Sequence, residues 1–527
     1  MATSRKSIKS FMPGIVVIVF IVATIFTALL SLWLFSFKQG EQNIVFDAYL
    51  QNVLLFTIKQ ALLSTFFSII IAVLLAKALF HLRFKGKALF LKLLSVTFVM
   101  PSLVVVTGLL TVYGNSGWLN QIFKFLDFDY SFSIYGLNGI LLGHIFLNFP
   151  FACRISFQTL HLIPYEQRQL SEQLGLNDWQ IFKLLEVPAL LKQLVPLSGL
   201  IFMLCFSSFA IVLALSGGPK YTTIEVAIYQ SIRDFELNQA VILSFIQLFF
   251  CIAFMVILQR IIPKRSVLIM SNNQAYLPPI SRYKKVIYSI IVLVSLFFIC
   301  TPIIAILVDG IFYFSLTYLK PQLITALFTS ISIAIISACF AMILSVILLF
   351  TNNKLQRYDY NKSSHLLMLF GSLILAVPSM VLSTGFFILF LGETDNFLLI
   401  LSLIILSNSF IALPFILKNL AQPIADLYNK YYFLSESLDI KGLNYLKLIA
   451  FKGLKNEFNY CLALAAIMSL GDFGIIALFG GQNIVTLPYV LYEQVSHYQS
   501  HEAGFTALIL CLLSFIFIYL FERSHYD

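Results

Sequence analysis

Long apolar runs recur along this chain and are separated by short polar segments. Twelve of these runs are long enough for a helix of roughly 20 residues to cross about 30 Å of hydrocarbon. The pattern therefore predicts membrane-spanning helices joined by polar loops. The runs begin near Pro13, Val53, Leu89, Gly139, Leu194, Ala240, Val286, Leu323, Leu366, Phe397, Phe458 and Ala503.

The composition indicates that lipid surrounds these helices. The chain of 527 residues is 60% hydrophobic and 11% charged, whereas soluble domains are about 45–50% apolar and about 25% charged. We therefore predict an all-α polytopic membrane protein in contact with the lipid bilayer. The first run, from Pro13 to Phe37, is too long for a signal peptide and has no small-residue cleavage site, so we expect it to remain as a helix.

Basic residues are distributed unevenly over the predicted loops. If the N-terminus is cytoplasmic, 26 of the 34 Lys and Arg residues lie in cytoplasmic segments, five in external segments and three in or beside spans. Because cationic residues are retained on the cytoplasmic side, this distribution places both termini in the cytoplasm. The net charge of +10 then follows from topology, and we expect no nucleic-acid partner. The five external residues are Lys38, Lys124, Lys220, Arg233 and Lys320.

The sequence lacks the motifs of common metal and nucleotide sites. The seven cysteines include no C-x-x-C pair, and the seven histidines include no H-E-x-x-H motif. The phosphate-binding motif G-x-x-x-x-G-K-[ST] is also missing from the sequence. We therefore expect no metal and no cofactor in this chain, and any nucleotide that drives it would be bound by another chain.

Three short motifs occur twice in the same order, which indicates an internal duplication. Pro101-Ser102 matches Pro378-Ser379, Ser171-Glu172 matches Ser435-Glu436, and Gly217-Gly218 matches Gly480-Gly481. The distance along the chain between the two copies is nearly constant, so the copies differ only by small insertions or deletions. Each copy holds six predicted spans, so both face the same way and form a parallel repeat with a pathway between them.

The expected organisation is about twelve transmembrane helices in two six-helix halves. The first half comprises residues 1–265, with a core at 52–262, and the second comprises residues 286–527, with a core at 321–521. Residues 266–285 between them are polar and basic and contain Pro278-Pro279, which predicts a cytoplasmic linker.

A predicted cytoplasmic loop of the first half has the pattern of two short helices joined at a glycine. A helix can run from Tyr165 to Leu174 and end at Gly175, which tolerates the left-handed conformation that closes many helices. Asn177 can then cap a second helix, with Gln180 completing a capping box. The pattern predicts a short, stiff helical elbow.

The second helix of this elbow carries apolar residues at helical spacing. Trp179, Phe182 and Leu185 recur at three-residue steps and would line one face. An exposed apolar face of this kind suits docking into a groove on a partner. The alternative is an amphipathic connector that packs on its own helix bundle.

The same loop resembles a motif of binding-protein-dependent permeases. Their pattern is E-A-A, three residues, G, nine residues, I, one residue and L-P. Here Gln169-Leu170-Ser171 is followed by Gly175 at the required distance, and Leu185 and Val187-Pro188 follow in turn. The spacing is met in full, although Gln-Leu-Ser replaces the acidic-alanine triplet.

This resemblance implies the fold of type I importers of the ATP-binding-cassette class, in a bacterial inner membrane. It implies that the two loops insert into clefts on two copies of a cytoplasmic ATP-binding subunit, which holds ATP and Mg. It also implies that an external binding protein delivers the substrate. The permease itself then performs no chemistry and alternates between two helix arrangements.

The second copy of the loop departs from the pattern. It reads Phe433-Leu434-Ser435-Glu436, and Asp439 stands where glycine is expected. Asp439 could cap a helix rather than end one, in which case Gly442 would supply the break. The resemblance implies that this loop docks as well, and the sequence leaves open whether it docks in the same way as the first.

The stretch from Asn148 to Gln230 resembles thiamine permeases of Gram-negative bacteria. The similarity is densest in Phe151-Ala-Cys-Arg154, in the stretch from Met203 to Phe209 and in that from Gly217 to Gln230. It implies that thiamine, or one of its phosphates, is the cargo delivered by a periplasmic thiamine-binding protein.

Three residues are candidates for the substrate pathway. Asp472 falls within a predicted span, where a charge is costly and usually faces a cavity or a partner. A carboxylate there would suit a cationic, aromatic cargo, and Phe209 and Phe473 are its apolar companions. The alternative is that Asp472 caps a helix break between two glycines or pairs with Lys59. Glu225 is expected to be solvated in an external loop or to contact the binding protein.

Two other functions fit parts of the pattern. A permease of the same fold for ferric iron, a polyamine or an inorganic anion would differ only in its site residues. An ion-coupled secondary transporter would need buried relays, for which Lys59 and Asp472 are the candidates. That second alternative leaves the spaced glycine-proline loop unexplained.

Overall fold

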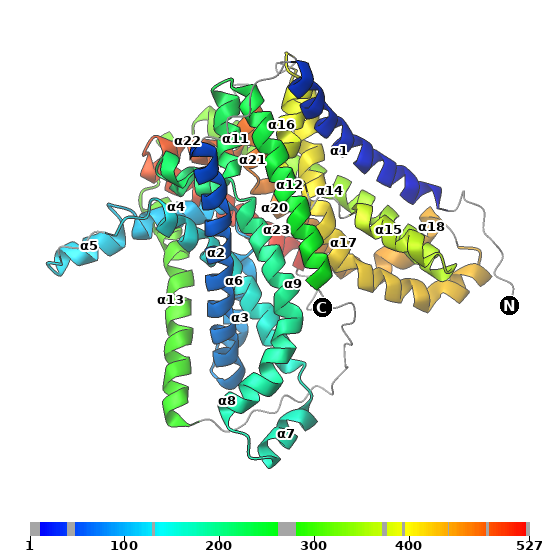
Figure 1. The fold of residues 1–527 in the computed structure, drawn as a ribbon, viewed down its shortest axis with the longest axis horizontal. Coiled ribbons are helices and arrows are strands. Elements are labelled where there is room, and N and C mark those ends of the chain that lie inside the picture. Colours follow the sequence, from blue (N-terminus) through cyan, green and yellow to red (C-terminus); the bar gives the residue numbers. More distant parts are fainter. Residues whose placement is uncertain are drawn as a thin grey trace.

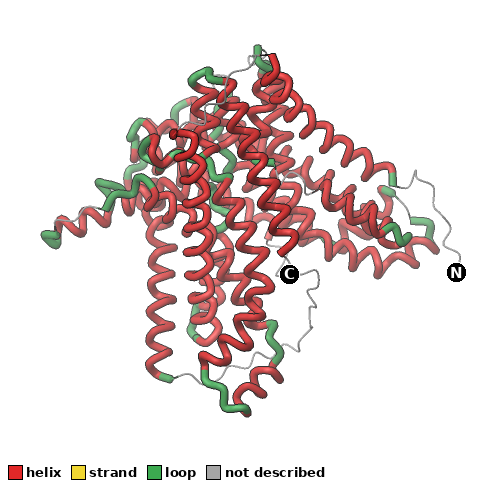
Figure 2. Tube along the Cα trace, viewed as in Figure 1, coloured by secondary structure: helices red, strands yellow, loops and turns green. Residues whose placement is uncertain are grey.

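The computed structural model describes residues 11–38, 48–128, 132–261, 281–371, 377–392, 396–440, 442–480 and 484–522. All regular elements in these ranges are helical (Figure 2), which confirms the predicted fold class. Eleven described segments are long and apolar enough to cross a membrane. Most of the predicted linker, Gly481 of the third motif and both chain ends lie outside the described residues.

The helices fall into two comparable series. The first series is α1 (Met12–Lys38), α2 (Ala48–His81), α3 (Lys87–Thr97), α4 (Ser102–Tyr113), α5 (Trp118–Phe125), α6 (Leu137–His161), α7 (Tyr165–Gln173), α8 (Asp178–Ile181), α9 (Val187–Phe206), α10 (Ala210–Leu215), α11 (Ile224–Arg233) and α12 (Leu237–Ile261). The second is α13 (Arg282–Phe312), α14 (Pro321–Arg357), α15 (Asn361–Gly371), α16 (Ser379–Leu389), α17 (Phe397–Ser437), α18 (Leu443–Tyr445), α19 (Phe451–Gly453), α20 (Lys455–Leu470), α21 (Gly474–Phe479), α22 (Leu487–Ser496) and α23 (Ser500–Glu522).

The predicted spans near Leu89 and Leu366 are each made of two shorter helices. Pro101 is the N-cap of α4 and Pro378 is the N-cap of α16, both in extended conformation. Proline lacks a backbone donor and clashes with the preceding turn, so each of these spans is discontinuous. The ninth predicted span is not among the eleven long segments, and its described parts are α15 and α16.

Matching hydrogen bonds support the internal repeat. In the first half, the Thr57 hydroxyl on α2 accepts from the Ile224 amide at 3.1 Å. In the second, the Ser330 hydroxyl on α14 accepts from the Leu487 amide at 2.8 Å. Ile224 and Leu487 are equivalent in the alignment that pairs the two Gly-Gly motifs, so both copies orient α11 and α22 in the same way.

The leading helix of each series packs on the opposite series. A Cβ at Gly108 on α4 would collide with the Pro302 carbonyl oxygen of α13, and a Cβ at Gly385 on α16 would collide with the Ala28 carbonyl oxygen of α1. The Ser31 hydroxyl of α1 donates to the Gly385 carbonyl at 2.6 Å. Thus α1, which the sequence placed with the first half, covers α14 and α16 of the second.

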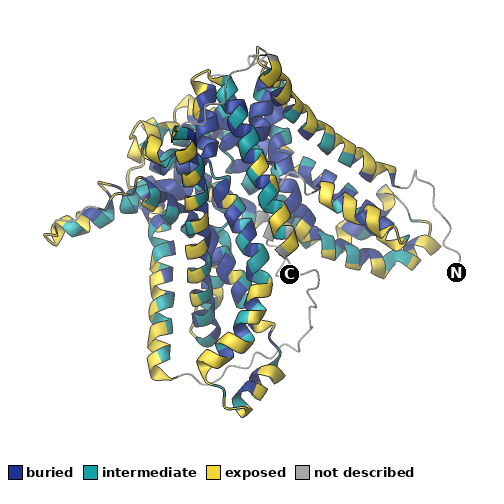
Figure 3. Cartoon of the chain, in the orientation of Figure 1, coloured by how far each residue is buried: buried dark blue, intermediate teal, exposed yellow. Residues whose placement is uncertain are grey.

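Two helix bundles diverge from a shared end in Figure 1. The bundle with α2, α6, α9 and α13 leads to α7 and α8, and the bundle with α14 and α17 leads to α18. Figure 3 shows buried helix faces concentrated where the bundles meet, whereas α7 and the outer end of α17 are mainly exposed.

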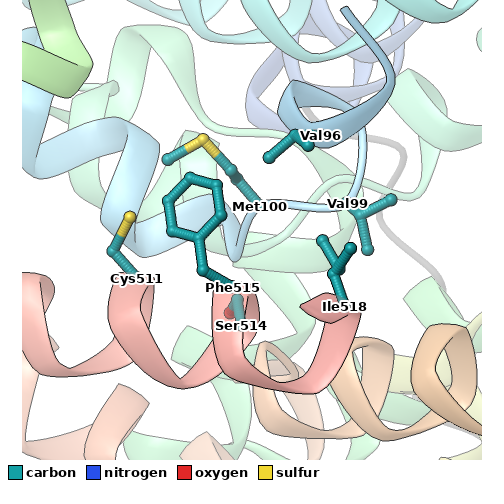
Figure 4. Close-up of a pocket in the computed structure, with 7 residues that line it drawn as sticks. All are labelled: Val96, Val99, Met100, Cys511, Ser514, Phe515 and Ile518. Carbon is teal, nitrogen blue, oxygen red and sulfur yellow. The ribbon is translucent and has the colours of Figure 1, made fainter. Parts of the chain in front are cut away.

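The turn between α3 and α4 contributes to the contact between the halves, because Val99 and Met100 face Cys511 and Phe515 of α23 across a narrow apolar crevice (Figure 4).

Candidate coupling elbows and transport cavity

The first elbow, residues 165–186, has the predicted local geometry. Gly175 follows α7 with a φ of +66°, and the Leu176 amide donates to the Ser171 carbonyl at 3.1 Å, which is a Schellman termination. Asn177 and Gln180 each bond the other's backbone amide at 2.9 Å. The predicted break at Gly175 and the predicted capping box are therefore confirmed.

The first elbow presents apolar side chains to its surroundings. Trp179 is 69% exposed, and Leu170, Leu174 and Leu184 are also exposed. The Trp179 ring contacts Phe182 at 5.8 Å between centroids, and Phe182 itself is half-buried. Their exposure leaves these four side chains accessible to a partner.

The predicted polar and proline positions of this loop lie on or beside α7 and α9. Gln169 is exposed on α7, whereas Ser171 is buried and its hydroxyl donates to the Arg168 carbonyl at 2.6 Å. Pro188 lies in the first turn of α9, where a missing backbone donor costs little. Residues Phe182–Glu186 form a π-helical turn just before it.

A buried group of charges anchors the first elbow. Glu186 accepts from Arg168 at 3.1 Å and lies 3.1 Å from the Lys77 ammonium on α2. Arg168 also donates to the Leu160 carbonyl at 3.1 Å and stacks over the Phe80 ring at 4.4 Å. Burial lowers the pKa of Arg168 while the Glu186 carboxylate raises it, and an arginine remains charged under either influence.

No motif in the sequence identifies this anchor. The available signal was Lys77, a cation within a predicted span, because a charge at that depth requires a partner. Glu186 supplies that partner, and Arg168 is the second cation of the group. We refer to Lys77, Arg168 and Glu186 as the charge anchor.

The second elbow, residues 429–450, ends its first helix at Asp439 and not at Gly442. Asp439 has a φ of +52°, and the Ile440 amide donates to the Ser435 carbonyl at 2.8 Å. This is the same termination that Gly175 makes, so Asp439 ends this helix and the expected break at Gly442 is wrong. Aspartate is one of the few non-glycine residues that tolerates this conformation. Gly442 has a φ of +60° and instead precedes α18.

The second elbow repeats the exposed apolar face. Leu434 and Leu438 are exposed and are equivalent to Leu170 and Leu174 in the alignment that pairs Ser171 with Ser435. Phe433 is exposed next to them, and Glu436 lies on the same outer turn of α17. Residues Leu446–Ala450 form a π-helical turn at the position of the one in the first elbow.

Aromatic packing takes the place of the charge anchor in this copy. By the same alignment, Tyr432 is equivalent to Arg168 and Ala450 to Glu186. Tyr428 contacts Tyr432 at 5.7 Å and Tyr445 at 6.2 Å between centroids, and Phe350 of α14 contacts Tyr445 at 5.6 Å. We call these four rings and Ala450 the aromatic anchor.

A cavity of about 280 Å³ lies between the halves and is lined by all three pathway candidates. Phe209 and Phe473 stack across the interface with centroids 5.7 Å apart and planes inclined by 21°. Asp472 precedes Phe473 on the wall of the same cavity. Residues of α4, α6, α9 and α10 line one side, and residues of α16, α17, α20 and α21 line the other.

Asp472 also caps the helix that follows it. Its Oδ2 atom accepts from the Ile475 amide of α21 at 3.4 Å. Among the described residues no ion pair joins it to Lys59, which is exposed on α2. The structure thus supports the helix-cap interpretation and the cavity-facing interpretation together.

Glu225 is placed differently from both expectations. It is fully buried on α11, and its carboxylate accepts from the side-chain amide nitrogen of Gln247 on α12 at 2.7 Å. The second carboxylate oxygen has no hydrogen-bond partner among the described residues. Its position after a Gly-Gly motif in a predicted external loop suggested that Glu225 faces solvent, but α11 packs against α12 and buries it.

Two same-facing helical halves, a cavity between them and two exposed elbows define a multi-pass membrane permease. Residues 68–267 match the family model of the binding-protein-dependent transport system inner membrane component. Three similar proteins are named thiamine transport system permease protein ThiP. The one from Salmonella typhimurium is 38% identical, over 99% of this chain and 98% of its own; the one from Escherichia coli is 37% identical, over 99% and 98%. The one from Haemophilus influenzae is 38% identical, over 98% of this chain and 97% of its own.

The chain belongs to this family of binding-protein-dependent permease proteins. It is therefore a subunit of a transport system and not an enzyme. A permease of this family operates with an ATPase and with an external binding protein.

Proposed function

We propose that this chain is the permease subunit of a thiamine importer. The observation that carries the proposal is similarity over nearly the whole chain to three permease proteins whose names specify thiamine transport. A binding protein in the periplasm delivers thiamine, and the chain releases it into the cytoplasm. The carboxylate in the cavity between the halves agrees with a cationic cargo.

The two elbows receive force from two copies of a cytoplasmic ATP-binding subunit, which bind ATP and Mg. Docking is supported by the exposed leucines that recur at equivalent positions, Leu170 and Leu434 and then Leu174 and Leu438. Apolar side chains on a projecting helix end gain stability by entering a groove on a partner. Both chain ends and both elbows then lie on the cytoplasmic side.

Movement of the elbows opens and closes the pathway. In the described arrangement the bundles diverge toward the elbows, and the Phe209–Phe473 stack joins the two halves. When ATP draws the two ATPase subunits together, the elbows approach each other and the bundles separate at the opposite end. Hydrolysis returns the permease to the diverging arrangement, and each state is favoured only by the partners that bind it better.

Reconstitution tests this proposal directly. The chain is purified with its ATPase subunits, inserted into liposomes and supplied with the cognate binding protein. Thiamine should stimulate ATP hydrolysis and enter the liposomes only with ATP. If ferric iron or another solute stimulates ATP hydrolysis and thiamine does not, that solute is the cargo instead of thiamine. Uptake driven by an ion gradient without any ATPase would overturn the importer assignment.

A further inference from the structure

The cavity between the halves is chemically asymmetric although its walls are related by the repeat. The alignment that pairs Ser171 with Ser435 also pairs Ser208 with Asp472 and Phe209 with Phe473. These last four residues all line the cavity. The repeat thus keeps the aromatic pair and places a carboxylate on one side only.

Rings from both halves continue on either side of the stacked pair. Tyr229 contacts Phe209 at 5.2 Å and Tyr492 contacts Phe473 at 4.8 Å between centroids. The four rings form a continuous row across the interface, from one half to the other. The row presents aromatic surface beside Asp472, because Phe209 and Phe473 also line the cavity.

The wall formed by the first half supplies neutral polar groups. Asn148 on α6 lines the cavity and uses its side-chain amide nitrogen to donate to the His144 carbonyl at 2.9 Å. His144 is buried, and its Nε2 atom has no hydrogen-bond partner among the described residues. Ser207 adds a hydroxyl. Asp472 is the single carboxylate in the described lining, which contains no Lys or Arg.

We propose that this cavity is a binding site for the cargo within the permease, with Asp472 as the counter-ion of a positively charged heteroaromatic ring. The inference rests on the proposed function and deepens it, because delivery by a binding protein does not by itself require a site between the helices. A carboxylate at this depth is costly unless it is paired, and a cargo cation removes that cost. The stacked rings contribute cation-π attraction and apolar contact. The volume of about 280 Å³ is near the lower limit of small-molecule sites, roughly 300 Å³.

Binding without the external protein tests the site. The complex of permease and ATPase is placed in lipid nanodiscs, and labelled thiamine binding is measured at equilibrium. Asp472→Asn keeps a side chain that can cap α21 and should weaken binding about tenfold, a typical effect of removing one charge-assisted contact. Asp309→Asn, which removes a carboxylate outside the cavity lining, should retain wild-type affinity.

A second test exchanges the residues at the two equivalent positions, 208 and 472. Asp472→Ser should lose affinity, and adding Ser208→Asp in the same chain should recover most of it, because the charge returns to the opposite wall. A simple thiazolium salt should compete with thiamine, whereas the corresponding uncharged thiazole should not. Unchanged affinity in Asp472→Asn, equal competition by both compounds, or no binding to the wild-type complex would overturn the site. Import with the binding protein, measured separately on the wild type, decides the proposed function independently of these outcomes.

Discussion

The two elbows reach one geometry through different chemistry. Both end a helix with a residue in the left-handed conformation, both expose leucines at equivalent positions, and both continue into a π-helical turn. The first is held by the charge anchor and the second by the aromatic anchor. The two copies of this fused duplicate therefore share their shape and their exposed surface, while their buried supports differ.

The supports differ in how they respond to loss of one member. A buried charge whose partner is removed stays unpaired in a low-dielectric environment. Removal of a ring leaves a cavity that neighbouring side chains can partly fill. Glu186 serves two cations at once. The first elbow should therefore be the more fragile of the two to single substitutions in its anchor.

The largest effect is expected from Glu186→Ala. Arg168 would stay buried without a counter-charge, and losses of this kind cost about 3–5 kcal/mol. The thermal unfolding midpoint of the purified permease should fall, and recovery of the ATPase subunits with it should drop. Glu166→Gln, an exposed position on α7, serves as the control. An unchanged midpoint for Glu186→Ala would show that the charge anchor does not support the elbow.

Replacing the three charged residues by those at the corresponding positions of the second half should reverse most of that loss. The triple variant Lys77→Phe, Arg168→Tyr and Glu186→Ala introduces the residues found at positions 350, 432 and 450, which are three of the five members of the aromatic anchor. Positions 77 and 350 correspond in the alignment that pairs Thr57 with Ser330. Replacement of a buried ion group by apolar residues is often neutral, so we expect stability within about 1–2 kcal/mol of the wild type. Unfolding midpoints of the single and triple variants are compared side by side. A triple variant no more stable than Glu186→Ala would mean that these three apolar residues cannot replace the charge anchor.

These supports also mark the limit of what the sequence could predict. Gly175 and the Asn177–Gln180 capping box are local signals, and the structure confirms both. The charge anchor joins Lys77 to residues far away along the chain, so no local spacing reveals it. The packing of α1 on the second half could not be predicted for the same reason, because the sequence of an apolar span does not indicate which helices it contacts.

The cavity shows the same division between local and distant information. Asp472 was identified because a charge in an apolar span is unusual, and its cap on α21 follows from adjacent residues. The stacking of Phe473 on Phe209 depends on contact between the halves. At Asp439 the signal was ambiguous, since aspartate both caps helices and tolerates the left-handed conformation. The left-handed backbone conformation of Asp439 shows that this residue ends the helix.

A smaller effect is expected from charges placed on the exposed faces. Leu174→Asp and Leu438→Asp alter residues that are exposed in the permease, so neither should lower its unfolding midpoint. Each should weaken association with the ATPase subunit about tenfold, or about 1.4 kcal/mol, because an unpaired charge would enter an apolar groove. Titration of purified ATPase onto nanodisc-embedded permease measures this affinity. If only the first variant weakens association, the second elbow does not dock as the first does.

The smallest effect concerns the two left-handed positions, and it is expected to have opposite signs in the two elbows. Gly175→Asp forces a side chain into a conformation that costs a typical residue roughly 1–2 kcal/mol and aspartate somewhat less. Asp439→Gly relieves that strain. No described atom lies within 4 Å of a Cβ built at Gly175, so steric clash does not enter the comparison. Hydrogen–deuterium exchange of the amides at 176 and 440, which close the two terminations, should be faster in Gly175→Asp and slower in Asp439→Gly. A change of the same sign in both variants would show that side-chain contacts of Asp439, and not its backbone conformation, set the stability of the second elbow.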